Sequence, residues 1–152
     1  MAQIAKIESQ AELKSSAAKF YGFFKSNMSS FVQMFPQIFK NFEVVGGGEI
    51  RTGSVTKWTY DLGEGVIAAK IKIQALDDGD TSITFVILEG DVLKVYKSFM
   101  AKMQVTKAGN GGSIVKWTLE FEKANSNTPD PKIYAEYAIK VSKGIDAYLG
   151  RA

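Results

Sequence analysis

The feature that most constrains the fold of this chain is a repeated alternation of apolar and polar residues between about residues 53 and 122. From Val115 to Glu122, every odd position is Val, Trp, Leu or Phe, and every even position is Lys, Thr or Glu. Similar runs lie at Ile67–Gln74, Ile83–Ile87 and Phe99–Thr106. Because neighbouring side chains of a strand point to opposite faces, this period of two predicts strands that bury one face.

Short polar segments that contain glycine separate these runs. They are Gly63-Glu64-Gly65, Asp77-Asp78-Gly79-Asp80 and Asn110-Gly111-Gly112. Glycine adopts the positive φ angles of tight hairpins without steric cost. We therefore expect an antiparallel meander of five strands over residues 53–122, with two further strands at about residues 3–12 and 40–46.

Two helical segments are expected ahead of the meander. Ser15 or Ser16 can cap a helix that carries the aromatic run Phe20–Phe24. A short second helix can hold Phe31–Phe35 and must end before Pro36. Both segments present several Phe side chains, so we expect them to pack against the sheet.

The last part of the chain predicts a long amphipathic helix. It starts near Thr128-Pro129-Asp130-Pro131, since proline suits the first turn of a helix. Apolar residues then recur at helical spacing, namely Tyr134, Tyr137, Ala138, Val141, Ile145 and Tyr148. Lys132, Glu136, Lys140 and Lys143 mostly occupy the other side. With the meander, this pattern indicates an α+β chain.

The absence of two residue types limits the chemistry. The chain contains no Cys and no His, which excludes disulfides, thiolate nucleophiles, cysteine-ligated zinc and any His-based catalytic triad. Carboxylates alone are a poor ligand set for zinc or copper. We therefore expect no metal and no cofactor, and any catalysis would depend on Tyr, Lys, Ser or a carboxylate, or on the shape of a pocket.

Length and charge suggest one small domain with few kinds of partner. The 152 residues are expected to form a single domain over 1–152, and the net charge of +3 is too weak to indicate nucleic-acid binding. The apolar runs are too short for a membrane span, and Met1–Glu12 lacks the apolar block of a secretory signal. We expect a cytoplasmic protein with no nucleic-acid partner and no stable membrane insertion, as a monomer or weak dimer.

Two loops resemble binding motifs in part. Gly48 and Gly53 have the spacing of a Walker A loop, but Ser54-Val55 stands where that motif requires Lys followed by Ser or Thr. The Asp77–Asp80 segment lacks the later ligands of a calcium-binding loop. We interpret the first as a loop between strands, with nucleotide binding as the alternative, and the second as a hairpin turn.

The aromatic residues leave two interpretations open. Ten Phe, six Tyr and two Trp are present, and several lie on the predicted inward faces. They can form a solid core, or they can line a cavity. Buried Tyr and Trp need hydrogen-bond partners for their polar atoms, which solvent or a ligand in a cavity can provide. Periodicity alone does not decide between the two.

Several local strings, in order along the whole chain, resemble the major latex proteins, a branch of the birch-pollen-allergen and pathogenesis-related class-ten superfamily of plants. The strings are Gly53-Ser54-Val55, Trp58-Thr59-Tyr60, Leu88-Glu89-Gly90-Asp91, Tyr96-Lys97-Ser98-Phe99, Gly112-Ser113-Ile114-Val115-Lys116-Trp117 and Leu119-Glu120-Phe121-Glu122-Lys123. Each string alone is weak evidence, but the ordered set is specific.

The resemblance implies a helix-grip (START-like) fold, in which a curved seven-stranded antiparallel sheet surrounds a long C-terminal helix and two short helices close one end. It also implies a large apolar cavity. Carried over to this chain, the candidate ligand-binding residues are Phe24, Phe35, Trp58, Tyr60, Ile71, Phe85, Ile87, Phe99, Met103, Trp117, Tyr134, Tyr137, Ala138 and Val141.

Two functions follow from the resemblance. The first is binding of a hydrophobic or amphipathic small molecule, such as a sterol, lipid, terpenoid or phenolic, with a role in plant defence or specialised metabolism. The alternative is a cofactor-free cyclase or isomerase, for example in nepetalactol-type cyclisation or an alkaloid pathway. Norcoclaurine synthase, a member of the superfamily, uses a Lys that Ile83–Leu88 does not contain, so that particular chemistry is disfavoured. Catalytic residues stay unassigned.

Overall fold

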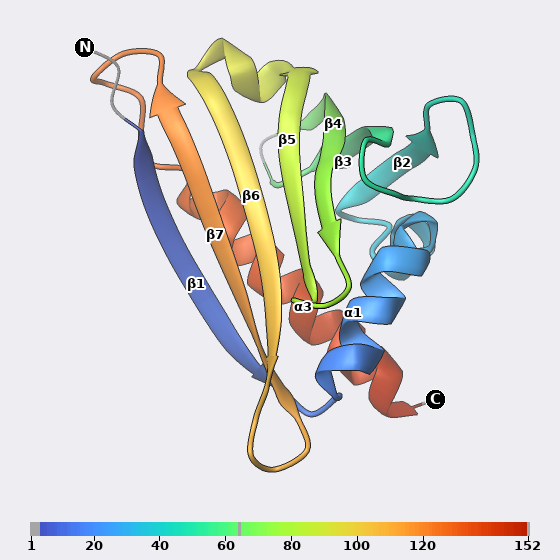
Figure 1. The fold of residues 1–152 in the computed structure, drawn as a ribbon. Helices are drawn as coiled ribbons and strands as arrows, with labels where there is room; N and C mark the ends of the chain where they lie inside the picture. Colours follow the sequence, from blue (N-terminus) through green and yellow to red (C-terminus); the bar gives the residue numbers. More distant parts are fainter. Residues whose placement is uncertain (1–3, 64, 152) are drawn as a thin grey trace.

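The protein forms one seven-stranded antiparallel sheet that curves around a long helix (Figure 1). The computed structural model describes residues 4–63 and 65–151, apart from the side chain of Arg151. The strands are β1 (Ala5–Leu13), β2 (Phe39–Val44), β3 (Val55–Asp61), β4 (Val66–Asp77), β5 (Ser82–Gly90), β6 (Tyr96–Lys107) and β7 (Ser113–Lys123). Their order in the sheet is β1-β7-β6-β5-β4-β3-β2, so the predicted meander is confirmed as β3 to β7.

The alternation in the sequence assigns each strand an inner and an outer face. Trp117 of β7 pairs with Ser9 of β1 on one side and with Met103 of β6 on the other. Trp117 and its same-face neighbour Val115 are buried, whereas Lys116 between them is exposed. The inner faces of the strands therefore form one continuous apolar surface, which the helices cover.

The hairpins use glycine where the sequence predicts it, with one exception. Gly63 and Gly65 between β3 and β4, and Gly111 between β6 and β7, all have positive φ. In the β4–β5 turn the residue with positive φ is Thr81 (φ 47°) rather than Gly79, which corrects the expectation for that turn. The Thr81 hydroxyl donates to the carbonyl of Val105 on β6.

Two short α-helices and two 3-10 turns lie in the connections of the sheet. α1 (Ala17–Ser26) is followed by the 3-10 turn η1 (Met28–Ser30) and by α2 (Phe31–Met34), and a further 3-10 turn, η2 (Asp91–Lys94), joins β5 to β6. Ser16, rather than Ser15, caps α1, because its hydroxyl accepts a 3.2 Å hydrogen bond from the amide of Lys19. Phe20 and Phe24 of α1 are buried against the sheet.

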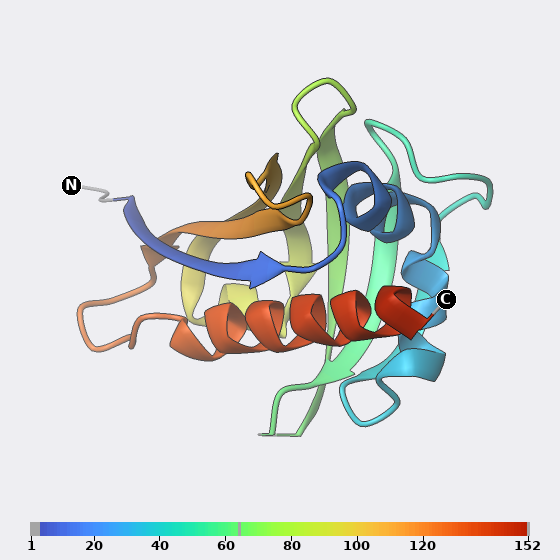
Figure 2. The ribbon, with the colours of Figure 1, turned by 90° about the horizontal axis from the view of Figure 1, so that it is seen from below.

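The helix α3 (Lys132–Arg151) begins directly after Pro131 and runs along the concave side of the sheet (Figure 2). Its charged side is exposed as predicted. One position of the apolar stripe was wrong: Tyr148 is 48% exposed, and Leu149 is buried instead. Leu149 follows Ile145 by four residues and so faces the core with it, while the Tyr148 ring leans on Phe23 at a centroid distance of 5.4 Å.

A carboxylate anchors the C-terminal half of α3 to the sheet. Asp146 accepts hydrogen bonds from the backbone amides of Lys14 and Ser15, both at 2.9 Å. These two amides lie in the turn between β1 and α1. Burial alone would raise the pKa of Asp146, but the hydrogen bonds outweigh burial and lower the pKa below its usual value.

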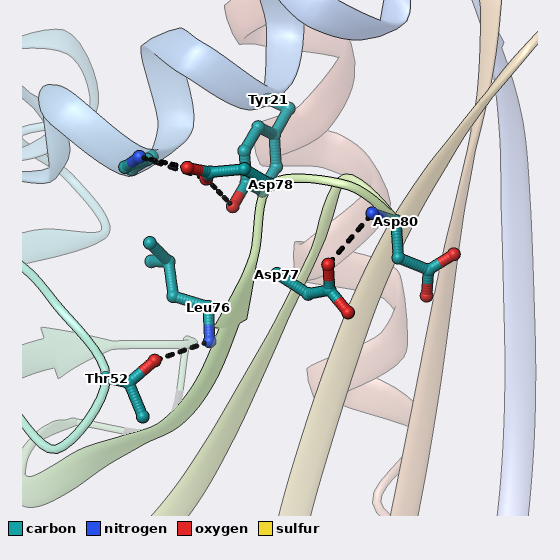
Figure 3. A network of polar contacts seen from close by, with 7 residues as sticks. Tyr21, Thr52, Leu76, Asp77, Asp78 and Asp80 are labelled. Carbon is teal, nitrogen blue, oxygen red and sulfur yellow. Dashed lines mark hydrogen bonds and ion pairs between the residues drawn. The ribbon is translucent and has the colours of Figure 1, made fainter.

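A second polar network ties the β4–β5 turn to α1 (Figure 3). Asp78 in the turn accepts hydrogen bonds from the Tyr21 hydroxyl (2.7 Å) and from the Lys25 ammonium (2.9 Å). On the neighbouring strand edge, the amide of Leu76 donates to the Thr52 hydroxyl at 3.1 Å and holds the β2–β3 loop. α1 and both loops are thereby held at this end of the sheet.

Within the part of the chain that the structure describes, no helix combines the length and the apolar character that crossing a membrane requires.

Candidate functional site

An apolar cavity of about 170 Å³ lies between the sheet and the N-terminal half of α3. Strands β3 to β7 contribute the floor, α3 contributes the roof, and α1, α2 and the start of β2 close one side. The wall is formed by Phe24, Phe31, Ile38, Phe39, Trp58, Tyr60, Leu62, Ile71, Phe85, Ile87, Phe99, Ala101, Trp117, Leu119, Tyr134, Tyr137, Ala138 and Val141.

The structure brings nearly all the candidate ligand-binding residues to this one space. Every residue of the predicted set lies in the wall except Phe35 and Met103. Their role as ligand contacts stays a prediction. The wall also contains six residues outside the predicted ligand-binding set, namely Phe31, Ile38, Phe39, Leu62, Ala101 and Leu119.

Some of these additional residues were accessible to sequence reasoning. Ala101 and Leu119 lie on inward faces that the alternation identifies, and Phe31 lies in the predicted second helix. Phe39 lies where the register of β2 shifts, next to Asn41, and Ile38 precedes the strand, so no periodic pattern extends across these positions.

Phe35 and Met103 are the two predicted residues that lie outside the wall. Phe35 packs on Phe31 and Phe39, and its ring lies against α3 at Gly144, where an added Cβ would come within 2.6 Å of the ring. Met103 is completely buried, between Ile83 and Trp117 of the flanking strands. Both side chains point inward as predicted, but neither belongs to the cavity wall: Met103 is enclosed by packed neighbours, and Phe35 is half-buried against Phe31, Phe39 and α3.

Aromatic rings close the side of the cavity that faces α1. The Phe24 ring lies 5.1 Å from Phe31 and 5.7 Å from Trp117, measured between centroids. Trp117 in turn stacks on Phe85 at 6.1 Å. The space therefore stops at this cluster and does not extend toward the C-terminal half of α3.

The two tryptophans of the wall have their polar atoms satisfied inside the protein. The Trp58 indole N–H donates to the Thr56 hydroxyl at 2.8 Å, and the Trp117 indole N–H donates to the Ser142 hydroxyl at 2.9 Å. The Ser142 hydroxyl donates onward to the carbonyl of Ala138 at 2.7 Å. These indoles consequently present only apolar ring surface to the cavity.

Two tyrosines form a polar corner at the start of α3. The hydroxyl oxygens of Tyr60 on β3 and Tyr134 on α3 lie 2.6 Å apart, and their rings meet edge to face. The Tyr134 ring also packs on Phe99 with a centroid distance of 5.0 Å. Burial is the main cause that raises the pKa of both phenols, so both are neutral at physiological pH.

Tyr137, one helical turn after Tyr134, lies where α3 meets the β3–β4 loop. A Cβ placed on Gly63 of that loop would be 3.7 Å from the Tyr137 hydroxyl. The ammonium of Lys140 lies over the Tyr137 ring, 5.3 Å from its centroid. The half-buried Leu62 belongs to the same loop, so this loop and Tyr137 form a part of the wall close to the molecular surface.

The wall, as far as the structure describes it, consists of apolar side chains and the hydroxyls of three tyrosines, without a carboxylate or an amine. The carboxylate of Asp91 contributes to the raised pKa of Tyr60 and Tyr134. It is occupied elsewhere, because it accepts from the amide of Ala68 and from Lys94. Such a wall can enclose and orient an apolar guest, and its polar chemistry is that of neutral phenols.

A curved antiparallel sheet, a long C-terminal helix across it and an apolar cavity between them define the class of helix-grip proteins. Within this class, the chain belongs to the pathogenesis-related protein Bet v 1 family, which it matches over residues 2–152. Proteins of this fold commonly bind hydrophobic ligands, and some are enzymes.

The similar proteins are mainly major latex-like proteins of plants. MLP-like protein 43 of Arabidopsis thaliana is 35% identical over 147 residues, which cover 96% of this chain and 93% of the relative. The crystal structure of major latex-like protein 151 from Panax ginseng superposes with a TM-score of 0.89 at 27% identity, covering 95% and 97% of the two chains. Norcoclaurine synthase from Thalictrum flavum has a TM-score of 0.85 at 17% identity over 99% of this chain and 88% of its own, which shows the shared fold alone.

Proposed function

We propose that this protein binds a compact hydrophobic or amphipathic small molecule in the cavity beneath α3 and acts as its carrier. The observation that supports the proposal is an apolar space of about 170 Å³ whose tryptophan N–H groups are already bonded within the protein. Water finds few partners there, so an organic guest is the occupant that best completes the packing.

The volume narrows the class of guest. An engineered apolar cavity of roughly 150 Å³ accepts one benzene ring, and sites for drug-sized ligands begin at roughly 300 Å³. The present cavity, at about 170 Å³, therefore suits a single ring with a short substituent or a small branched chain. Since the similar proteins are from plants, we propose small phenolics and small terpenoids rather than sterols or long-chain lipids.

Burial supplies the affinity. Binding that removes roughly 200 Å² of a one-ring guest's apolar surface from water contributes about 5 kcal/mol at ~25 cal/mol per Å². Ordering the guest reduces this gain. For a simple probe such as ethylbenzene we expect a dissociation constant on the order of 1 mM.

The proposal can be tested by filling the cavity. Ala138 lies in the wall, whereas Ala147 of the same helix is exposed. In Ala138→Phe the new ring occupies the guest's space, so ethylbenzene binding should weaken more than tenfold. Both tryptophans of the chain, Trp58 and Trp117, line the cavity, so their fluorescence during a titration measures binding directly.

The matched control is Ala147→Phe, which adds the same ring on the solvent side of α3. It should bind ethylbenzene like the wild-type protein. Circular dichroism of both variants checks that the fold is retained. If Ala138→Phe is folded and still binds ethylbenzene with wild-type affinity, the cavity is not the binding site.

A further inference from the structure

The buried tyrosines of this protein differ in how their phenolic protons are used. The Tyr21 hydroxyl donates to Asp78 at 2.7 Å, and the Tyr96 hydroxyl donates to the carbonyl of Pro129. Each of these phenols therefore has its own acceptor. Tyr60 and Tyr134 instead share a single 2.6 Å contact, in which either oxygen can be the donor.

That contact accounts for only one of two protons. Two neutral phenols carry two O–H donors, and a hydrogen bond between their oxygens uses one of them. Among the residues that the structure describes, neither the Tyr60 nor the Tyr134 hydroxyl has another hydrogen-bond partner. Asp91, whose charge both phenols sense, is bonded to Ala68 and Lys94 instead.

The remaining donor borders the cavity. Both tyrosines belong to the wall, and Tyr60 is only 5% exposed. The Tyr134 ring is held between Tyr60 and Phe99, with ring centroids 6.1 and 5.0 Å away, so the packing restricts the position of the pair. A buried O–H without an acceptor costs free energy, and the cavity is the space in which a guest can supply one.

We propose that the Tyr60–Tyr134 pair is the polar recognition point of the cavity, and that it donates one O–H to an oxygen atom of the guest. The ligand class is then a compact ring or branched chain that carries a carbonyl, hydroxyl or ether oxygen, rather than a pure hydrocarbon. This inference rests on the proposed function, because it names which small molecules the same cavity selects.

The pair offers the donor in either arrangement. If Tyr134 donates to Tyr60, the Tyr60 proton is available to the guest, and the reverse holds if Tyr60 donates. A guest oxygen that leaves water must regain a hydrogen bond, or its burial is unfavourable. The pair meets this requirement in the buried part of the wall, because the third wall hydroxyl, that of Tyr137, lies beside the β3–β4 loop. A hydrocarbon guest leaves the O–H of the pair without an acceptor.

Two probes of nearly equal shape test the inference. Acetophenone differs from ethylbenzene by a carbonyl in place of a methylene group, and both have the single ring that the cavity volume suits. Tryptophan fluorescence gives the affinity of each probe. Loss of one hydrogen bond should lower the preference for acetophenone over ethylbenzene by about fivefold in the double variant Tyr60→Phe/Tyr134→Phe. Either single variant keeps one donor and should retain most of the preference.

Tyr96→Phe is the matched control, because it removes a phenol oxygen that does not belong to the wall. It should leave the ratio of the two affinities unchanged. The infrared carbonyl band of bound acetophenone provides a second readout. The band should lie at lower frequency in the wild-type protein than in the double variant, where the donor is absent.

The outcomes separate the two proposals. If wild-type protein binds both probes and the double variant leaves their affinity ratio and the carbonyl band unchanged, the recognition point is wrong while the carrier proposal stands. If wild-type protein binds neither probe, the carrier proposal for one-ring guests fails, and the recognition point fails with it.

Discussion

The contact between α3 and the sheet differs between the two halves of the helix, although the strands below both halves have the same apolar alternation. One half is tightly packed, and the other encloses a cavity. Around the C-terminal half of α3, the side chains of Ile145, Phe20 on α1, and Met103 and Val115 on neighbouring strands are at most 1% exposed. Around the N-terminal half, inward side chains of the same strands surround a cavity of about 170 Å³. The hydrogen bond from Trp117 to Ser142 lies between the two halves.

The difference teaches that apolar alternation specifies which face of a strand is covered but not how closely the covering helix approaches. In the packed half, α1 and the Asp146 anchor bring α3 close to β1 and β7. In the hollow half, the large rings of Tyr60 and Tyr134 meet at their hydroxyls and span the distance between β3 and the helix. Packing of the first kind stabilises the fold, and the second kind leaves room for a guest.

The comparison is sharpest on β4, where two isoleucines lie two residues apart on the same face. Ile73 is completely buried, and Ile71 belongs to the cavity wall. Ile73→Ala removes contacts on all sides and should lower the free energy of unfolding by about 4 kcal/mol. Ile71→Ala, which extends a space that already exists, should cost only about 1 to 2 kcal/mol. Urea denaturation followed by circular dichroism measures both.

Ile71→Ala should also change which guests bind, whereas Ile73→Ala should not. By enlarging the cavity, Ile71→Ala should admit guests with one more branch than the wild-type protein accepts, whereas Ile73→Ala should not change guest size. Equal losses of stability in the two variants would show that the cavity closes in solution, and would contradict the division into halves.

Much of the architecture was predictable because periodicity reports local geometry. The strands of the meander and the amphipathic α3 follow directly from spacings of two and of three to four residues, and the inward faces supplied most of the cavity wall. The one error in the α3 stripe was Tyr148 in place of Leu149, although Leu149 follows Ile145 by four residues and faces the core with it. The ring of Tyr148 instead covers Phe23.

The remaining features depend on contacts between distant parts of the chain. The Tyr60–Tyr134 contact joins residues 74 positions apart, and no pattern in either segment indicates it. Phe35 has the spacing of a pocket residue, yet Gly144 lets its ring lie against α3 outside the cavity. Whether an inward aromatic side chain fills the core or lines a cavity depends on contacts between distant segments, which local sequence patterns do not reveal.

The Phe35–Gly144 contact gives a prediction of intermediate size. A Cβ at Gly144 would come within 2.6 Å of the Phe35 ring, whereas a Cβ at Gly22 in α1 would meet nothing within 4 Å. Gly144→Ala should therefore lower the free energy of unfolding by about 1 to 3 kcal/mol through overpacking. Gly22→Ala should raise it by about 0.5 to 1 kcal/mol, because alanine is the better helix former.

Thermal denaturation compares these two glycine variants, and a third one identifies the cause. Phe35→Leu removes the ring that the new Cβ meets. Gly144→Ala should therefore lower the stability less when it is added to Phe35→Leu than when it is added to the wild-type protein. If Gly144→Ala were stabilising like Gly22→Ala, the contact between Phe35 and α3 would not exist in solution.

The two halves should also respond to pH in opposite directions. Hydrogen bonds lower the pKa of Asp146 in the packed half, so the ionised carboxylate stabilises the fold above pH about 4, and this stabilisation is lost as the pH falls through the lowered pKa. Burial raises the pKa of Tyr60 and Tyr134 in the hollow half. Their neutral forms favour folding below pH about 10, and this stabilisation is lost as the pH rises further.

A substitution in one half should therefore change the pH dependence of stability on one side only, either the acid side or the alkaline side. Urea midpoints measured from pH 2 to 11 should decline less steeply on the acid side in Asp146→Asn, with the alkaline side unchanged. The reverse should hold for Tyr60→Phe/Tyr134→Phe. The pKa values of Asp78 and Asp130 are also lowered, and that of Tyr21 is also raised. These groups contribute to the loss of stability at acid and alkaline pH in both variants, so the expected changes are small. A variant that altered both sides equally would indicate that the anchor and the tyrosine pair act through one cooperative core, rather than through two halves with separate roles.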